Sequence, residues 1–175
     1  NVKEYNLETL YNKIGYAPQQ AVIFSGSIRS NIDFGKRGNG DMTEEDVLKS
    51  LEISQGMEFV QNMPGELDGA VAQAGTNLSG GQKQRLAIAR AVARDAEILI
   101  FDDSFSALDY KTDQLVREAL AEQTHGATTL IVAQRIGTIM DADQIIVLDE
   151  GNMVGIGKHK ELLDTCQVYR EIAES

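Results

Sequence analysis

Residues 77–93, NLSGGQKQRLAIARAVA, decide how the rest of the chain is interpreted. Ser79 is a favourable helix N-cap, and apolar side chains recur at helical spacing over residues 82–93, which predicts a helix beginning just after Ser79. Gly80 and Gly81 cost conformational entropy at a helix start, so they indicate that something approaches the backbone closely. Free amide groups and the helix dipole favour a phosphate there, although Ser-Gly-Gly taken alone also fits an ordinary cap.

A short strand with acids at its end follows this helix. Residues 97–101, EILIF, form a nearly unbroken apolar run, which predicts a parallel strand covered on both faces. Asp102 and Asp103 come directly after it, at the carboxyl end of the strand, where open α/β sheets bind ligands. Asp102 suits a Mg²⁺ ion carried by a nucleotide, because that ion takes few protein ligands and keeps its waters. Residues 106–109, SALD, follow directly.

The composition limits the classes of protein to which the chain can belong. Its 175 residues suffice for one domain with a hydrophobic core, and the net charge of −11 argues against a nucleic-acid or anionic-lipid surface. The single cysteine, Cys166, excludes an internal disulfide and a cysteine metal site, and fits a reducing cytosol. No apolar run approaches the ~20 residues needed to span a bilayer, so we expect no direct membrane insertion by this chain.

Strand and helix patterns alternate along the sequence, which predicts an α/β fold with a mainly parallel sheet. The predicted strands cover residues 13–17, 97–101, 128–133, 143–148 and 153–157. The predicted helices cover residues 6–12, 82–93, 111–123 and 160–175, with further short helices within 43–63.

Three segments together resemble one known family. The LSGGQ of residues 78–82, the apolar strand that ends in two acids, and the SALD of residues 106–109 are similar to the ATP-binding domain of ABC transporters, specifically the exporter type. The resemblance runs from about Tyr5 to Tyr169. It implies ATP and Mg²⁺ as cofactors and a P-loop NTPase (RecA-like) fold. The implied division of the chain is a core of residues 1–20 and 95–175 with an inserted helical subdomain of residues 21–94.

The same resemblance implies roles for individual residues. In the family two ATP-binding domains meet head to tail, so the signature contacts ATP held by the partner domain; its residues here are Leu78, Ser79, Gly80, Gly81 and Gln82. The D-loop is Ser106, Ala107, Leu108 and Asp109. On the chain's own nucleotide, Asp102 and Gln19 are implied metal ligands, and the implied catalytic residues are Asp103, Gln134 and Gln19. Taken alone, Gln19 fits a solvated turn equally well.

Partner contacts are also implied. Residues 21–35 resemble the segment on which a coupling helix of the transmembrane domain docks, although a core-packing segment has the same apolar pattern. The loop 69–75 carries Gln73 where exporters usually have an acidic residue, which puts communication through this loop in doubt.

The chain departs from the family where the phosphates should be held. The motif Gly-x-x-x-x-Gly-Lys-Ser/Thr is absent from the sequence, so we interpret the chain as a fragment, incomplete at its amino end and inactive in isolation. In this fold the strand before that motif lies between the strands 128–133 and 143–148. Its absence therefore predicts a gap in the sheet.

Two catalytic positions differ as well. Asp103 stands where the family usually has Glu, which draws the carboxylate back by more than ~1 Å, and a displacement of that size can cost ~100-fold in rate. Gln134 stands where the family usually has His, and an amide can donate a hydrogen bond but cannot carry a proton. Together these changes indicate a degenerate catalytic site.

The function that the resemblance implies is an ATP-hydrolysing subunit that powers export, at the cytoplasmic face of a bacterial cell membrane, in a heterodimer with a second ATP-binding domain. Two alternatives belong to other classes. One is a soluble ABC ATPase without membrane partners, and the other is a nucleotide-binding regulatory subunit that does not hydrolyse ATP. Whether the whole protein and its partner hydrolyse ATP, and which acid is required, discriminates among them.

Overall fold

The computed structural model describes residues 1–35, 40–124 and 126–174, and the chain forms two compact units, Asn1–Val132 and Ala133–Ser175. The elements of the first unit are α1 (Leu7–Asn12), β1 (Ile14–Ala17), β2 (Gly26–Ser27), α2 (Ile28–Ile32), α3 (Glu44–Ile53), α4 (Met57–Gln61), β3 (Ala70–Val71), α5 (Gly80–Ala93), β4 (Ile98–Asp102), α6 (Tyr110–Gln123) and β5 (Thr128–Val132). Short 3-10 turns cover Val2–Glu4, Glu66–Asp68 and Gln73–Gly75.

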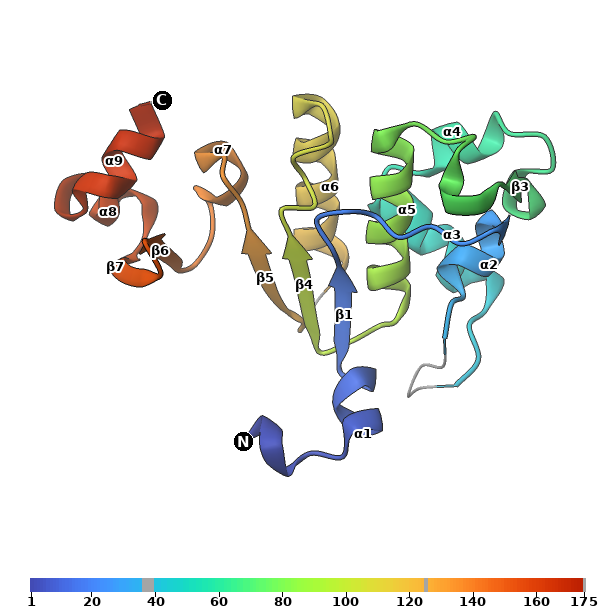
Figure 1. Ribbon diagram of the computed structural model, residues 1–175, viewed down its shortest axis with the longest axis horizontal. Coiled ribbons are helices and arrows are strands. Elements are labelled where there is room, and N and C mark those ends of the chain that lie inside the picture. Colours follow the sequence, from blue (N-terminus) through green and yellow to red (C-terminus); the bar gives the residue numbers. More distant parts are fainter. Residues whose placement is uncertain (36–39, 125, 175) are drawn as a thin grey trace. The chain divides into compact units, whose positions relative to one another are not determined.

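The first unit is built on a parallel sheet in the order β1-β4-β5, as the alternating pattern predicted. The three strands lie side by side in Figure 1, and α5 packs against β1. Residues of β1 and β4 that point to one face, such as Ala17, Leu99 and Phe101, are buried in a cluster with Ile88 of α5 and Val116 of α6. This cluster is the core beneath the sheet.

Among the described residues of the first unit no layer packs on the opposite face of the sheet, so in this unit the prediction of a strand covered on both faces is wrong. Tyr16, Leu130 and Val132 are 49%, 51% and 49% exposed, and Ile98 is 37% exposed. Because α5 and α6 both contribute to the cluster on one face, the alternate side chains of the same strands face outward. The apolar run of residues 97–101 correctly indicates that both faces of the strand carry apolar side chains. It does not indicate whether helices cover one face or both.

Residues between β1 and β4 in the sequence form a separate apolar cluster. It joins side chains of α2, α3, α4 and α5, among them Ile28, Leu51, Val60 and Leu86. The predicted helices within 43–63 are confirmed as α3 and α4. The antiparallel pair of β2 and β3 was not predicted, because two residues per strand are too few to show a period. Residues 36–39 lie outside the described part.

The second unit contains α7 (Ile136–Ile139), β6 (Ile145–Asp149), β7 (Asn152–Gly157), α8 (His159–Thr165) and α9 (Gln167–Glu174). β6 and β7 pair antiparallel as a two-stranded sheet. Their inner side chains, Ile145 and Val147, pack with Leu162 and Tyr169. The single helix predicted for residues 160–175 is instead two helices, because Cys166 is extended (φ −119°, ψ 108°) with its side chain buried; residue 175 lies outside the described part.

The predicted gap concerns strands of the two different units and stays a prediction. β5 forms one edge of the three-stranded sheet, with β4 as its neighbour, and β6 has β7 as its neighbour in its own two-stranded sheet. None of the helices in the described ranges combines the length and the apolar character that crossing a membrane requires.

Candidate nucleotide site

The signature segment opens α5 with a reciprocal cap. The Ser79 hydroxyl oxygen accepts a hydrogen bond from the Gln82 backbone N–H at 3.2 Å, and the Gln82 Oε1 accepts one from the Ser79 N–H at 2.8 Å. Leu78, at 8% exposure, anchors the segment to the helical cluster. The predicted helix start is thereby confirmed, and both glycines lie at the first positions of the helix.

The two glycines are not required by packing within the chain. A Cβ on Gly80 would meet no atom within 4 Å, and one on Gly81 would meet only the Ala107 carbonyl oxygen, at 3.6 Å. Alanine would therefore fit at both positions and would stabilise the helix, so packing within the chain does not explain why glycine stands there. The lack of side chains there leaves the helix amino terminus open to an anion from outside the chain.

Asp102 and Asp103 lie at the carboxyl end of β4, and side chains from β1 and the residues after it reach both. The Tyr16 hydroxyl donates to Asp102 Oδ2 at 3.1 Å, and Gln19 Nε2 donates to Asp103 Oδ2 at 3.2 Å. Asp103 has a positive φ of 45°, and its N–H donates to the Val132 carbonyl oxygen at 2.9 Å. The sheet thus brings Gln19, which the sequence had linked to this site only by resemblance, to the two acids at the end of β4.

Tyr16 was not singled out in the sequence. Its hydrogen bond to Asp102 raises the pKa of the phenol above its usual value, so the hydroxyl keeps its proton and remains a donor to the carboxylate. The available signal was the alternation of Tyr16 with Gly15 and Ala17, which places its ring on the same face of the sheet as Asp102.

The segment 106–109 connects this edge of the sheet to α6. The Ser106 hydroxyl donates to the Asp103 carbonyl oxygen at 2.8 Å, and Leu108 is buried in the core. Asp109 caps α6 by accepting from the N–H and the hydroxyl of Thr112, which lowers the pKa of its carboxyl group. Because Ala107 lies beside Gly81, the predicted D-loop and signature are neighbours in the fold.

Gln134 belongs to the second unit. It is exposed and lies in the bend between β5 and α7, just before Arg135, the N-cap of α7.

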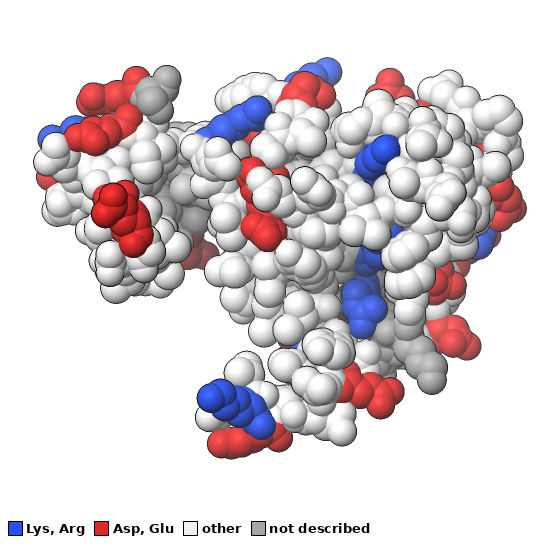
Figure 2. Space-filling model, in the orientation of Figure 1, with Lys and Arg blue, Asp and Glu red and all other residues white. Residues whose placement is uncertain are grey.

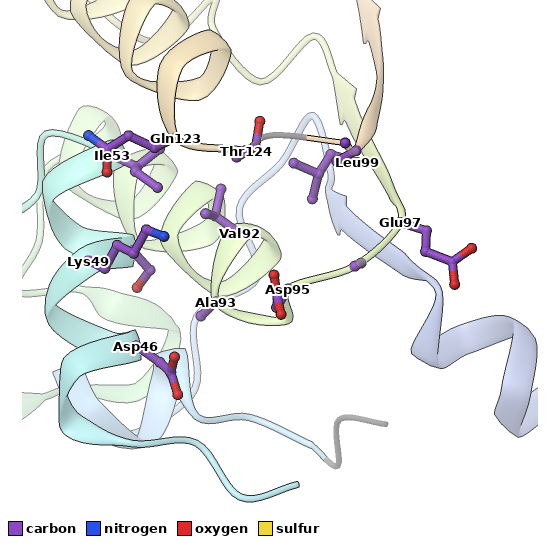
Figure 3. A pocket seen from close by; sticks show the side chains of 14 residues that line it. Asp46, Lys49, Ile53, Val92, Ala93, Asp95, Glu97, Leu99, Gln123 and Thr124 are labelled. Carbon is purple, nitrogen blue, oxygen red and sulfur yellow. The ribbon is translucent and has the colours of Figure 1, made fainter. Parts of the chain in front are cut away.

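One cavity among the described residues lies away from this site. It has a volume of about 360 Å³ and lies at the opposite end of β4, beside Glu97 and Leu99 (Figure 3). Asp46, Lys49 and Asp95 also line it, and no residue predicted to contact nucleotide does. Glu97 points away from the cavity (Figure 3) and is ion-paired with Lys13, which leaves the carboxylates of Asp46 and Asp95 beside the one ammonium of Lys49. This acidic excess disfavours a phosphate, so the cavity does not compete with the sheet edge as a nucleotide site.

Charged side chains are interspersed over the surface. On the face shown in Figure 2, Lys and Arg lie in small separate groups among acidic and uncharged residues.

Comparison with known proteins agrees with a nucleotide-binding site at this edge of the sheet. The profile of the family described as ABC transporter matches residues 1–106. An uncharacterized ABC transporter ATP-binding protein of Mycobacterium tuberculosis is 44% identical over 175 residues, which is 100% of this chain and 30% of that protein. A multidrug resistance ABC transporter ATP-binding and permease protein of Lactococcus lactis is 40% identical over 168 residues, or 96% and 28% of the two chains. A solved structure of a bacterial Atm1-family ABC exporter with ATP bound matches with a TM-score of 0.88 and 34% identity, covering 95% of this chain and 29% of that one.

Two acids at the carboxyl end of a parallel sheet, close to a helix that begins at two adjacent glycines, define an α/β nucleotide-binding domain. The chain belongs to the ABC transporter family, as an ATP-binding domain of the exporter type. Domains of this family bind ATP, generally with Mg²⁺, and in exporters they dimerise and work with transmembrane domains. The chain spans about 30% of the length of the relatives reported above.

Proposed function

We propose that this chain is the nucleotide-hydrolysing part of a heterodimeric exporter, located at the cytoplasmic face of a bacterial cell membrane. The observation that carries the proposal is the hydrogen bond from Gln19 to Asp103, which joins residues 84 positions apart at the ligand-binding edge of the sheet. The name of the Lactococcus lactis relative, an ATP-binding and permease protein, supports the link to transport.

The residues at this edge fit a magnesium ion that arrives with a nucleotide. Asp102 is only half-buried, and its carboxylate oxygens are the hard ligands that Mg²⁺ prefers. In the described ranges no group of three or more His, Cys, Asp or Glu gathers to make a protein-only metal site, which suits an ion that keeps waters and phosphate oxygens. We assign Asp102 and Gln19 to the metal, which when bound neutralises charge on the transferred phosphate.

The remaining roles are those that the resemblance to the family implies. Gln19 and Asp103 orient the attacking water, and Gln134 donates a hydrogen bond toward the γ-phosphate. These 175 residues contain no Gly-x-x-x-x-Gly-Lys segment, so they provide no loop that could hold the α- and β-phosphates. Ser79, Gly80 and Gly81 serve ATP held by the partner domain, and the free space around both glycines supports this role.

Two further parts of the proposal concern the division of the chain and its docking surface. The separate apolar cluster of α2–α5 supports a helical subdomain within residues 21–94, and we assign residues 1–20 and 95–175 to the core of the domain as the resemblance implies. Phe24 and Phe34 are 37% and 50% exposed and stack with ring centroids 4.1 Å apart. We assign this aromatic pair to the surface that receives a coupling helix of the transmembrane domain.

The chain's own site is proposed to turn over slowly, because Asp103 and Gln134 keep contacts to metal and phosphate but activate water poorly. This also favours a second candidate function, a subunit that retains nucleotide without hydrolysing it. Single-turnover hydrolysis at this site decides between them in the longer protein with its partner. Asp103→Glu combined with Gln134→His should raise it, and no change would remove the degenerate-site proposal.

The signature is tested at the other nucleotide. Gly81→Asp introduces a carboxylate beside the proposed phosphate position, so ATP hydrolysis by the heterodimer should be lost while nucleotide binding is largely kept. Gly137→Asp is a matched control, because Gly137 is also a helical glycine whose added Cβ meets no atom within 4 Å. Wild-type turnover in Gly81→Asp would mean that the signature is only a helix cap.

A further inference from the structure

Two buried side chains hold the backbone that leads into Gln19. Ser104 is fully buried, and its hydroxyl donates to the Ala17 carbonyl oxygen at 2.7 Å. Gln84 is 2% exposed, and its Nε2 donates to the Pro18 carbonyl oxygen at 3.1 Å. The two accepting carbonyls belong to the two residues directly before Gln19. Hydrogen bonds from α5 and from the turn after β4 therefore hold the backbone next to Gln19.

Gln84 lies on the apolar stripe of α5, where a hydrocarbon side chain is the usual choice. Its neighbours on that stripe, Ala87, Ile88 and Ala91, are all buried. Burying an amide costs free energy unless a hydrogen bond compensates for the lost water, and the Pro18 carbonyl oxygen supplies that bond. A glutamine here is explained by what it holds in place rather than by packing.

The same helix begins with the signature. Gln84 lies just over one turn after Ser79, the N-cap of α5, so its bond to Pro18 joins the signature helix directly to the segment that carries Gln19. A second contact ties the same strand to the same helix: a Cβ on Gly15 would lie 2.3 Å from the Ala91 carbonyl oxygen, so the two backbones touch. The end of β1 is therefore fixed to α5 at two points.

We propose that Gln84 and Ser104 are positioning residues, which hold Gln19 against Asp103 and couple the setting of Gln19 to the signature helix. This rests on the function proposed above, because it gives Gln19 and the signature their roles at two different nucleotides. Displacement of α5 by the partner's nucleotide pulls on Pro18 through Gln84, and so changes the Gln19–Asp103 contact at this chain's own site.

The test uses the longer protein that contains this chain, assembled with its partner domain. Gln84→Met and Ser104→Ala each remove one donor with little change in volume. Ser50→Ala is the matched control, because Ser50 is also buried and its hydroxyl bonds to the Val47 carbonyl oxygen within α3, away from the site. Hydrogen exchange of the Gln19 and Gln20 amides should be several-fold faster in the first two variants and unchanged in Ser50→Ala.

Measurements of ATP turnover distinguish positioning of Gln19 from a general loss of stability. In Gln84→Met, single-turnover hydrolysis at this chain's site should fall roughly 10-fold, since small displacements of a positioning group are costly, while the KM for MgATP stays constant. In a Gln19→Ala background Gln84→Met should have no further effect, because it acts through Gln19.

Equal losses in both backgrounds, or unchanged exchange at Gln19 and Gln20, would overturn the proposal. If the wild-type assembly does not hydrolyse ATP, the proposed function fails on its own. The exchange measurement still decides whether Gln84 and Ser104 position Gln19.

Discussion

Replacing Arg90 by Met should destabilise the chain by about 2 kcal/mol, and the structure supplies the terms. The Arg90 guanidinium donates to the Asn31 carbonyl oxygen at 2.7 Å, the Asn31 Oδ1 at 3.0 Å and the Val22 carbonyl oxygen at 2.8 Å. Its Cζ lies 5.1 Å from the ring centroid of Phe24. One side chain of the signature helix thereby holds most of the segment proposed to receive the transmembrane domain.

The free-energy cost of losing each hydrogen bond depends on how exposed its acceptor is. Asn31 is fully buried, so its carbonyl oxygen, left without this donor, costs about 1–3 kcal/mol. Val22 is 54% exposed, and water can replace the donor at its carbonyl oxygen. Loss of the contact with Phe24 adds about 0.5–1 kcal/mol. Burial lowers the pKa of Arg90, because its charge is partly removed from water. Methionine avoids this desolvation cost, so the net loss of folding free energy is about 2 kcal/mol.

Urea denaturation of the purified chain, followed by far-ultraviolet circular dichroism because the sequence contains no Trp, measures this loss. Arg94→Met is the matched control, at the C-cap of the same helix. Its bonds, to the Tyr11 carbonyl oxygen at 3.2 Å and Asn12 Oδ1 at 3.5 Å, are longer, and it should cost about 0.5 kcal/mol. Arg90→Lys should fall between the two, since one ammonium lacks the planar fork of donors. Equal effects of Arg90→Met and Arg94→Met would refute the reasoning.

Two further predictions concern packing and ligand binding. Gly15→Ala places a methyl group 2.3 Å from the Ala91 carbonyl oxygen and 2.7 Å from Leu99 Cδ2, so it should cost about 1–3 kcal/mol in urea denaturation, whereas Gly137→Ala, with open space, should cost nothing or stabilise its helix. The purified 175-residue chain should not bind MgATP in calorimetric titration, because it lacks the glycine-rich segment that supplies most phosphate contacts; a dissociation constant near micromolar would contradict this.

The parts of the structure that the sequence predicted are those with local causes. The cap at Ser79 and the helical spacing that follows it placed α5, and the apolar run before Asp102 placed β4. The side-chain contacts at the site have no local cause. Gln19 meets Asp103 and Tyr16 meets Asp102 only because β1 and β4 pair in a particular register, with Ala17 opposite Phe101, and no local pattern specifies that register.

Buried polar side chains were missed for a related reason. Glutamine and serine are usually exposed, so the sequence predicts surface positions for Gln84 and Ser104. Only the fold shows that each lies within hydrogen-bonding distance of a backbone carbonyl. The break at Cys166 is similar, because its extended backbone is stabilised by burying the side chain against β7, far from it in sequence. Helical periodicity continues through that position and cannot report the break.

The open face and edge of the sheet lead to the last prediction, that the purified chain associates with itself. β5 forms an edge of the sheet, and Leu130 and Val132 expose about half of their side-chain surface there, next to Tyr16 and Ile98 on the same face. Strand edges of this kind pair with other chains, and exposed apolar patches favour the same outcome.

Size-exclusion chromatography with light scattering should therefore show concentration-dependent dimers or larger species. Leu130→Lys should return the chain toward a monomer, because a charged side chain on an edge strand opposes pairing and costs little where the side chain is already exposed. Tyr110→Lys is the matched control, since Tyr110 is 74% exposed at the start of α6, away from the strand edge. Hydrogen exchange over residues 130–132 completes the test: slow exchange in a stable wild-type monomer would mean that this edge is already satisfied, and the prediction would be wrong.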